Sequence, residues 1–180
     1  MTGTEHRISL AGKPYSLYGK RIHEGQIAPD FYFTGIHLTR HNFYSFKKSY
    51  KLISVFPSID TGVCSSQNIF FDKKAAEFSD NVKFIAISTD LPFSIKRFYE
   101  TKCLSHIEMI SDHNYLDFGK KYGMLIQELR LLTRAVIIVD DKNIVRYIEH
   151  VREITDHPDY SDAIKTLKRL LKESDMLIHQ

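Results

Sequence analysis

Short apolar runs that alternate with helix-like segments constrain the fold of this chain more than any other feature. Each run has the length of a buried strand, and the segments between the runs carry apolar residues at helical spacing, which is typical of parallel strands joined by helices. The runs cover residues 52–56, 82–88, 107–110 and 135–139. The last one is followed by Asp140-Asp141-Lys142-Asn143 and a further apolar run, 144–148, which together predict an antiparallel hairpin. We therefore expect a mixed α/β sheet with helices on both faces.

The two ends of the chain carry clear local patterns. Ile8-Ser9-Leu10 and Tyr15-Ser16-Leu17 alternate around Ala11-Gly12-Lys13-Pro14, which predicts a small β-hairpin. A long C-terminal helix is predicted by a stripe of 3.6-residue period: Tyr160, Ala163, Ile164, Leu167, Leu170 and Leu171. Shorter elements are expected at 31–33 (strand), about 93–101 (helix) and 115–122 (helix, ended by Gly123). With 180 residues and no linker-like segment, we expect one domain, 1–180, in which 1–24 is an N-terminal hairpin extension.

The composition excludes several classes of function. Apolar and charged fractions of 43% and 26% are ordinary for a soluble protein, and no apolar run approaches the roughly 18 residues of a membrane helix. Residues 1–7 lack the apolar centre of a signal peptide. The formal net charge of +3 is too small to imply a nucleic-acid partner, and the lysine pairs Lys47-Lys48, Lys73-Lys74 and Lys120-Lys121 are scattered. We expect a cytoplasmic protein that binds neither membranes nor nucleic acids.

The chain has two cysteines and nine histidines, which limit the disulfide and metal-binding chemistry that it can have. Two cysteines are too few for a disulfide scaffold, so Cys64 and Cys103 are expected to rest as thiols in a reducing compartment, and any bridge between them would be transient. His37 and His41 have the spacing of a metal-binding pair but lie among aromatic and turn residues. Surface or packing histidines are therefore expected, and no metal site is predicted.

The segment Pro57-Ser58-Ile59-Asp60-Thr61-Gly62-Val63-Cys64 joins a buried strand to a helix-like segment. Cys64 thus falls in the first turn of a helix, where free N–H groups and the helix dipole favour a thiolate. Thr61, three residues earlier, can direct its hydroxyl at the sulfur. The cysteine also shares a core-facing stripe with Phe71, Ala75 and Phe78. A thiolate with a hydroxyl and an arginine as partners is suited to attack the O–O bond of a peroxide and to become a sulfenic acid.

These residues resemble the peroxiredoxin active-site pattern Pro-x-x-x-Thr-x-x-Cys. The fuller segment 54–64 is similar to the bacterial thiol peroxidase subfamily, which is of the atypical two-cysteine type. Three further stretches agree with that subfamily in order and spacing: Ser88-Thr89-Asp90-Leu91-Pro92-Phe93, Arg134-Ala135-Val136 and Glu153-Ile154-Thr155-x-x-Pro158-Asp159-Tyr160. The resemblance covers nearly the whole chain, including the N-terminal hairpin, and it implies a thioredoxin-like fold.

The resemblance also implies a role for each matching residue. Cys64 would be the peroxidatic cysteine, Thr61 its hydroxyl partner, Pro57 the residue that shields it and Arg134 the arginine of the site. An arginine at the start of a strand is more often a surface charge. Because its neighbours also match the subfamily pattern, we assign Arg134 to the site, with Arg130 as the second candidate.

The position of the resolving cysteine departs from the subfamily. The resemblance implies a cysteine directly after an Arg-Phe or Arg-Trp pair, but Arg97-Phe98 is followed by Tyr99. Cys103 lies four residues later, about 6 Å further along a helix. Because a disulfide needs Cα atoms within roughly 7 Å, Cys103 can pair with Cys64 only after local unfolding or a changed helix end. Two interpretations stay open: Cys103 is a displaced resolving cysteine, or it is an apolar cysteine at a helix end and an external thiol resolves the Cys64 sulfenate.

We expect a thiol peroxidase that reduces hydrogen peroxide and small organic hydroperoxides without a metal or bound cofactor. The resemblance implies thioredoxin or another thiol as the reductant, and it suggests a homodimer. The alternative is a peroxide-sensing redox relay or binding protein with slow or no turnover, which the missing cysteine at Tyr99 would favour. An inactive scaffold is disfavoured because Pro57, Thr61, Cys64 and Arg134 are all present.

Overall fold

The computed structural model describes residues 7–46, 50–78 and 81–178. Residues 1–6 of the predicted N-terminal extension and the pair Lys47-Lys48 lie outside these ranges. In chain order the elements are β1 (Arg7–Leu10), β2 (Lys13–Tyr18), β3 (Tyr32–Gly35), β4 (Arg40–Asn42), the 3₁₀ turn η1 (Phe43–Ser45), β5 (Tyr50–Val55), α1 (Gly62–Ala75), β6 (Val82–Ser88), α2 (Pro92–Thr101), β7 (Ile107–Ser111), α3 (Asp117–Tyr122), β8 (Leu125–Ile126), β9 (Leu131–Leu132), β10 (Ala135–Val139), β11 (Val145–His150) and α4 (Tyr160–Ile178).

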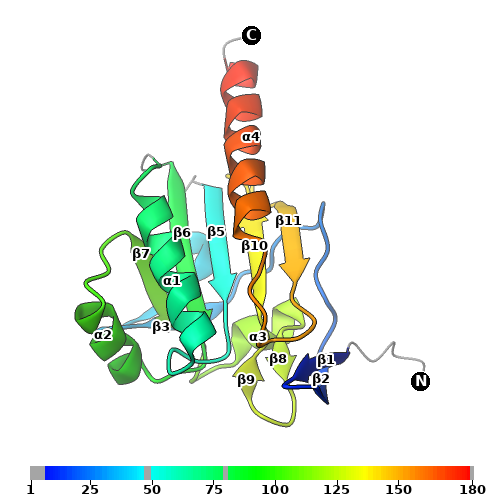
Figure 1. Ribbon diagram of the computed structural model, residues 1–180. Helices are drawn as coiled ribbons and strands as arrows, with labels where there is room; N and C mark the ends of the chain where they lie inside the picture. The colour runs from blue at the N-terminus through cyan, green and yellow to red at the C-terminus, as the bar shows by residue number, and fades with distance from the viewer. Residues whose placement is uncertain (1–6, 47–49, 79–80, 179–180) are drawn as a thin grey trace.

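The predicted mixed sheet is confirmed (Figure 1). Within the described residues its seven strands follow the order β11-β10-β5-β6-β7-β3-β4. β5, β6 and β7 are parallel, while β10 runs antiparallel to both β5 and β11. Because α1 and α2 each follow a parallel strand, both helices begin at the same edge of the sheet, where the strands end. That edge holds the loop that contains Thr61.

Helices cover both faces of this sheet, as predicted. On one face, α1, α2 and α4 pack over a core that includes Phe56, Phe71, Phe84, Phe98 and Leu167. On the other face, α3 and residues 22–46 pack over a second core, which includes Phe31, Phe33, Phe43, Phe118 and Tyr122. The central strands contribute apolar residues to both cores on alternate positions, so they are buried on both sides. Their buried polar residues are Lys51, Ser54, Ser88 and Ser111.

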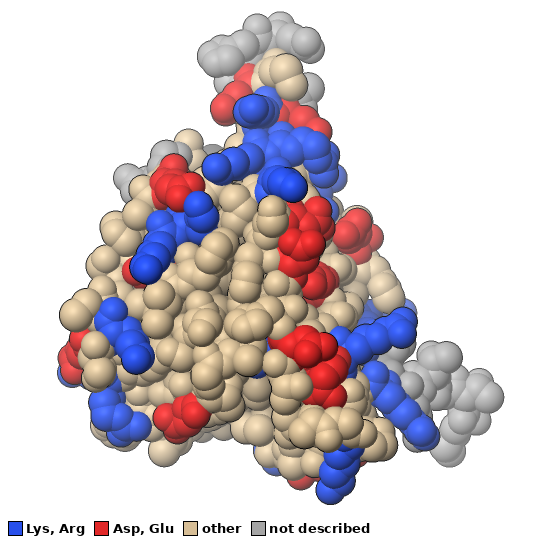
Figure 2. Space-filling view, in the orientation of Figure 1, with Lys and Arg blue, Asp and Glu red and all other residues tan. Residues whose placement is uncertain are grey.

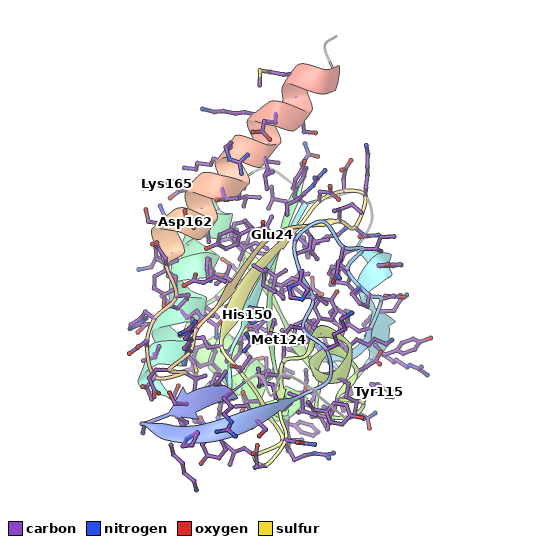
Figure 3. All side chains as sticks on the ribbon, turned by 90° about the vertical axis from the view of Figure 1, so that its right-hand side faces the viewer. Glu24, Tyr115, Met124, His150, Asp162 and Lys165 are labelled. Carbon is purple, nitrogen blue, oxygen red and sulfur yellow. The ribbon has the colours of Figure 1, made fainter. Side chains whose placement is uncertain are left out.

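The predicted N-terminal hairpin is also confirmed. β1 and β2 pair in antiparallel register and, with β8 and β9, form a small separate sheet. Figure 3 shows the hairpin at the base of the molecule, at the opposite end from the free end of α4. The strands β8 and β9 were not predicted, because two residues each are too few to show a period.

Several predicted boundaries were wrong by a few residues. The strand expected at 31–33 is β3 and begins at Tyr32, one residue later. Helix α1 ends at Ala75, so Phe78 packs against the core from the turn beyond the helix. The helix expected from Tyr115 begins at Asp117, because Leu116 has a left-handed backbone (φ 49°) that a helix cannot include. Its end at Gly123, with φ 66°, agrees with the prediction.

Charged side chains lie around the margins of the face formed by α1 and α4, and the middle of that face is uncharged (Figure 2). Basic residues gather on α4: Lys165, Lys168, Arg169 and Lys172. Some of them form exposed ion pairs, Arg169 with Glu173 and Lys168 with Glu77, of the kind that contribute little to stability. In the part of the chain that the structure describes, no helix is long and apolar enough to cross a membrane.

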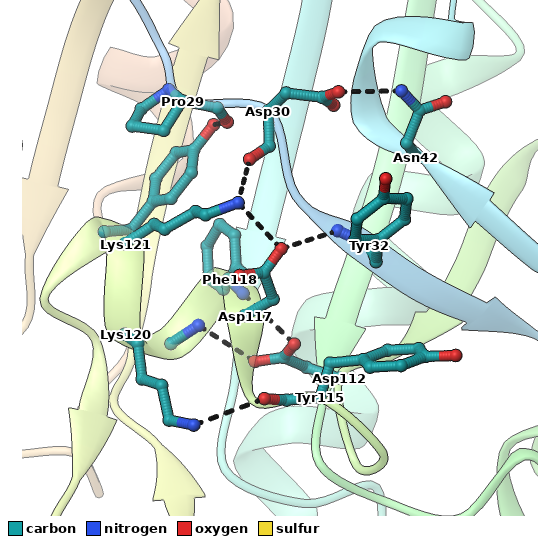
Figure 4. Close-up of polar contacts among 12 residues, drawn as sticks. Pro29, Asp30, Tyr32, Asn42, Asp112, Tyr115, Asp117, Phe118, Lys120 and Lys121 are labelled. Atoms are coloured by element: carbon teal, nitrogen blue, oxygen red, sulfur yellow. Dashed lines mark hydrogen bonds and ion pairs between the residues drawn. The ribbon is translucent and has the colours of Figure 1, made fainter.

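Buried Asp112 anchors the start of α3 (Figure 4). Its carboxylate accepts the N–H groups of Phe118 (3.1 Å) and Gly119 (2.9 Å), which have no partner within the helix. Burial raises the pKa of Asp112 to about 7, although the N–H donors of Gly119 and Phe118 act in the opposite direction. The folded protein therefore retains this proton at pH values where the unfolded chain has lost it.

We predict a pH-dependent stability difference between the wild type and Asp112→Asn. The pKa of this carboxyl is about 4 in the unfolded chain and about 7 in the folded protein, so the wild type loses stability as the pH rises between these two values. The asparagine keeps one carbonyl acceptor and has no such loss. Between about pH 5 and about pH 8 the difference in unfolding free energy should move in favour of the variant by up to about 3 kcal/mol. Urea unfolding at fixed ionic strength measures it, and a difference that is constant with pH would contradict the prediction.

Candidate functional site

The loop between β5 and α1 places Cys64 in the first turn of α1. Pro57 is buried at the exit of β5, where a residue without an N–H group ends the strand pairing. Thr61 is the N-cap of α1: its backbone is extended and its hydroxyl oxygen accepts the N–H of Cys64 at 3.4 Å. The prediction that Cys64 lies in the first helical turn is confirmed.

The sulfur of Cys64 is buried and receives two hydrogen bonds. The hydroxyl of Thr61 donates to Sγ at 2.7 Å, and Nη2 of Arg134 donates to Sγ at 3.2 Å. Cys64 has no exposed surface, and the guanidinium comes from a residue 70 positions away in the sequence. Both contacts place positive hydrogens on the sulfur, so both stabilise negative charge there.

Arg134 is the largest fully buried side chain of the described residues, and each of its nitrogens has an acceptor. Nε donates to the carbonyl oxygen of Ile154 at 2.8 Å, Nη1 donates to Oε1 of Gln67 at 2.5 Å, and Nη2 donates to Cys64. A buried guanidinium is costly unless its donors are paired in this way. The predicted role for Arg134, rather than Arg130, therefore fits the geometry; Arg130 lies outside this constellation in a left-handed turn (φ 57°).

Gln67, which orients the arginine, was not predicted as a site residue. Gln67 is fully buried, and its amide nitrogen donates to Oγ of Ser54 at 2.8 Å, which fixes the amide oxygen toward Arg134. Ser54 donates in turn to Asn68 at 3.3 Å. The available signal was the position of Gln67 three residues after Cys64, on the same helical face as the apolar stripe.

Asp90, which holds the loop before Thr61, was also not predicted as a site residue. Its carboxylate accepts hydrogen bonds from the hydroxyl of Ser58 (2.8 Å), the N–H of Ile59 (2.9 Å) and the hydroxyl of Ser88 (2.7 Å). Its carbonyl oxygen accepts the hydroxyl of Ser111. Asp90 therefore ties together the loops that follow β5, β6 and β7. The sequence signal was its place directly after the strand 82–88, at the edge where Cys64 was expected.

The structure corrects the sequence-based geometry of Cys103. α2 ends at Thr101, so Cys103 is not one helical turn beyond Tyr99 on the same face; it lies outside the helix in a left-handed turn (φ 53°). Cys103 is exposed, whereas Cys64 is buried, and both are free thiols. The nearby loop is held by Asp72, whose carboxylate accepts three successive N–H groups from Ser105 to Ile107.

Cys103 lies at the opposite end of α2 from the Cys64 loop. The start of α2 follows Asp90, which binds Ser58 and Ile59 of that loop, and the ten residues of the helix then span about 15 Å. The loop that follows Cys103 is bound by Asp72 of α1. Asp72 is eight residues beyond Cys64, which is about 12 Å along the helix. A bridge between the two cysteines therefore requires part of α2 to unwind.

Tyr160, the first residue of α4, lies close to this site. Its ring stacks on Phe70 of α1 at 4.6 Å, and its hydroxyl is hydrogen-bonded to Nδ1 of His157 at 2.6 Å. Burial, opposed by Arg134 and assisted by Cys64 and Glu149, raises the pKa of Tyr160 to about 12. Tyr160 therefore remains a neutral phenol near the Cys64 sulfur. Among the described residues, no three His, Cys, Asp or Glu side chains are arranged to hold a metal ion.

Comparison with known proteins identifies the family. The family model described as Redoxin matches residues 23–164. Thiol peroxidases from Oceanobacillus iheyensis and Halalkalibacterium halodurans are 40% and 43% identical to this chain, over 90% and 91% of it and 98% of each relative. The crystal structure of a peroxiredoxin-like protein from Aquifex aeolicus superposes with a TM-score of 0.85 at 32% identity, covering 91% of this chain and 96% of that one. A thiol peroxidase from Chromobacterium violaceum, 23% identical, shares the fold with a TM-score of 0.80, over 94% and 97% of the two chains.

The matched region shows that the chain belongs to the Redoxin family. Within that family it is an enzyme of the thiol peroxidase class, since its similarity to those proteins extends over nine-tenths of its length. The predicted thioredoxin-like fold and peroxiredoxin class are confirmed, and a redox relay without turnover is not favoured. The assignment of residues 1–180 to one domain, with 1–24 as an extension, stays a prediction; the Redoxin match covers residues 23–164.

We predict that Thr61 has two separable functions, which Thr61→Val and Thr61→Ser distinguish. Valine removes both the helix cap and the hydrogen bond to Sγ, so the variant should lose about 1 kcal/mol of stability and its rate of Cys64 oxidation by peroxide should fall by about 100-fold. Serine keeps the hydroxyl and should restore most of both. Thermal unfolding and single-turnover oxidation measure the two effects; a valine variant with the wild-type oxidation rate would contradict the assignment.

Proposed function

We propose that Cys64 is the peroxidatic cysteine of this enzyme and that Thr61 and Arg134 are its catalytic partners. The observation that supports this most directly is the pair of donors on one buried sulfur, Thr61 at 2.7 Å and Arg134 at 3.2 Å. Donors on sulfur stabilise the thiolate, and the same donors can contact the peroxide oxygens once a substrate approaches. Pro57 is proposed to shield the sulfur from water at the head of the loop.

In the first half-reaction, the thiolate of Cys64 attacks one oxygen of the O–O bond. An S–O bond forms, the O–O bond breaks, and the departing oxygen takes a proton and leaves as water or an alcohol. Sulfur loses two electrons and becomes a sulfenic acid. Because negative charge moves from sulfur to the departing oxygen, an arginine and a hydroxyl already fixed at the sulfur can stabilise that charge and lower the barrier. Hydrogen peroxide and small organic hydroperoxides are the proposed substrates.

In the second half-reaction, we propose that an external thiol attacks the sulfenic acid, forming a disulfide and releasing water. Two features support an external thiol over Cys103. The subfamily's resolving position holds Tyr99, and Cys103 lies beyond the end of α2, far from the Cys64 loop. A second thiol then reduces the mixed disulfide and restores Cys64. The reductant that we propose is a dithiol protein of the thioredoxin type, which supplies both thiols. We propose that the enzyme works in the cytoplasm.

Two cysteine variants test this cycle. Cys64→Ser should abolish peroxide consumption, whereas the matched Cys103→Ser should keep most of the wild-type turnover with a thioredoxin-type reductant. Peroxide consumption under multiple turnover is the measurement. If Cys64→Ser kept near-wild-type turnover, the proposed function itself would be wrong.

The same pair of variants decides the fate of the sulfenic acid. After one equivalent of peroxide, we expect peptide mapping of the wild type to find Cys64 as a trappable sulfenic acid and Cys103 as a thiol. A Cys64–Cys103 disulfide, together with loss of turnover in Cys103→Ser, would overturn the external-thiol step and assign resolution to Cys103 after unwinding of α2.

We also propose that the enzyme is a homodimer. Leu91 and Phe93, which directly follow the loop clamp Asp90, are 54% and 66% exposed. Two large, exposed apolar side chains so close in the chain are typical of a surface that a partner covers, and a second copy placed here would lie next to the site. Sedimentation at micromolar concentration should show a dimer for the wild type and a monomer for Phe93→Asp. A wild-type monomer at that concentration would contradict the proposal.

A further inference from the structure

The motif Glu153-Ile154-Thr155 is used by the site only through one main-chain atom, the carbonyl oxygen of Ile154 that accepts Nε of Arg134 at 2.8 Å. The side chain beside it, Glu153, is nevertheless the most heavily hydrogen-bonded carboxylate near the hairpin. It accepts five hydrogen bonds: from Ser9 Oγ (2.8 Å), Ala11 N (2.9 Å), Gly12 N (3.0 Å), Thr155 N (3.1 Å) and Thr155 Oγ1 (2.7 Å). Three of the donors belong to the N-terminal hairpin, and two belong to the segment that carries Ile154.

The backbones of these two segments are joined at the same place. The N–H of Ser9 donates to the carbonyl oxygen of Arg152 at 2.8 Å, and the N–H of Ile154 donates to the carbonyl oxygen of Ser9 at 2.9 Å. Both main-chain polar groups of Ile154 are therefore hydrogen-bonded: its N–H donates to β1, and its carbonyl oxygen accepts from Arg134. The side chain of Ile154 is buried in a small core with Ile8, Leu17 and Ile126.

A continuous chain of contacts thus connects the hairpin to the reactive sulfur. It runs from Ser9 and Glu153 to Ile154, from Ile154 to Arg134, and from Arg134 to Sγ of Cys64. We propose that Glu153 is a positioning residue for the peroxidase reaction: by tying the N-terminal hairpin to residues 152–155, it fixes the carbonyl that aims Arg134 at Cys64. This inference rests on the proposed function of Arg134 and Cys64.

The charge and the geometry of Glu153 suit it to this role. The N–H of Gly12, with the hydroxyls of Thr155 and Ser9, lowers the pKa of Glu153 to about 2, so the carboxylate stays ionised wherever the enzyme works. An ionised carboxylate holds N–H and O–H donors more strongly than a neutral acceptor does. Arg134 needs such support because Nη2 acts on the sulfur only from one orientation, and a displacement of about 1 Å at a reacting group can cost about 100-fold in rate.

The experiment compares Glu153→Ala with a matched control in the same hairpin. Glu128 accepts the N–H of Ser16 on the second hairpin strand, at 3.1 and 3.3 Å through its two oxygens, so Glu128→Ala also removes a carboxylate clamp from the hairpin. It does so through Ser16, next to the pairing of β2 with β8, and not through a hydrogen bond to residues 152–155. Two rates are measured for each protein: oxidation of Cys64 by hydrogen peroxide, and alkylation of Cys64 by iodoacetamide. Alkylation needs a thiolate and access but no stabilisation of a departing oxygen.

We expect Glu153→Ala to slow peroxide oxidation by about tenfold or more, with a much smaller change in the alkylation rate. Glu153→Gln, which keeps one acceptor oxygen, should recover part of the loss, and Glu128→Ala should react like the wild type. Ser9→Ala is a milder second variant, which removes one hydrogen bond to Glu153 and leaves the backbone bonds, and it should show a smaller loss of the same kind.

Three results would overturn the proposal. They are a wild-type oxidation rate in Glu153→Ala, an equal change of both rates, which would indicate general loosening of the fold, and an equal loss in Glu128→Ala. If Glu153→Ala does not fold, Glu153→Gln and Ser9→Ala decide by the same ratio of rates. Each of these outcomes is distinct from failure of the proposed function, because that would appear as activity in Cys64→Ser.

Discussion

The buried guanidinium of Arg134 is the interaction on which the rest of the site depends. Almost none of its surface is exposed, so its three hydrogen-bonded nitrogens must be satisfied by the protein. Gln67 comes from α1, Ile154 from the segment before α4, and Cys64 from the first helical turn. Each acceptor restricts the plane of the guanidinium further. A residue that would be costly to bury alone thereby becomes a rigid donor aimed at sulfur.

The sheet supplies the frame for this arrangement. β5, β6 and β7 are parallel, so the loops that follow them gather at one edge, and Asp90 binds all three. The antiparallel pairing of β10 with β5 places Ala135 opposite Val55, which brings Arg134 to the edge from which the Cys64 loop emerges. On its other side, the arginine is supported by the N-terminal hairpin through Ile154. Two sheets thus hold one side chain.

The sequence predicted those features of the site that depend on near neighbours. Thr61 and Cys64 are three residues apart at a helix start, where a hydroxyl at the N-cap reaches both the N–H and the sulfur of the third helical residue. Gln67 and Asp90 were missed, because a buried amide and a carboxylate after a strand look like ordinary polar residues until their partners are known. The predicted geometry of Cys103 was wrong for a local reason: α2 ends at Thr101, two residues before Cys103, and the left-handed backbone of Cys103 takes the thiol off the helical face.

By itself, then, the sequence determined the succession of the main strands and helices along the chain, the helix start just before Cys64, the hydroxyl beside the cysteine and the family to which the pattern belongs. Each follows from the spacing of a few residues or from matching motifs. The resemblance also named Arg134 and Pro57, but only the tertiary structure decided how the arginine is held at the sulfur and which other residues support it. Arg134 lies 70 positions from Cys64, and Glu153 lies 144 positions from Ser9. Contacts over such separations are fixed by sheet pairing and by the need to satisfy buried polar groups, and neither leaves a periodic trace in the sequence.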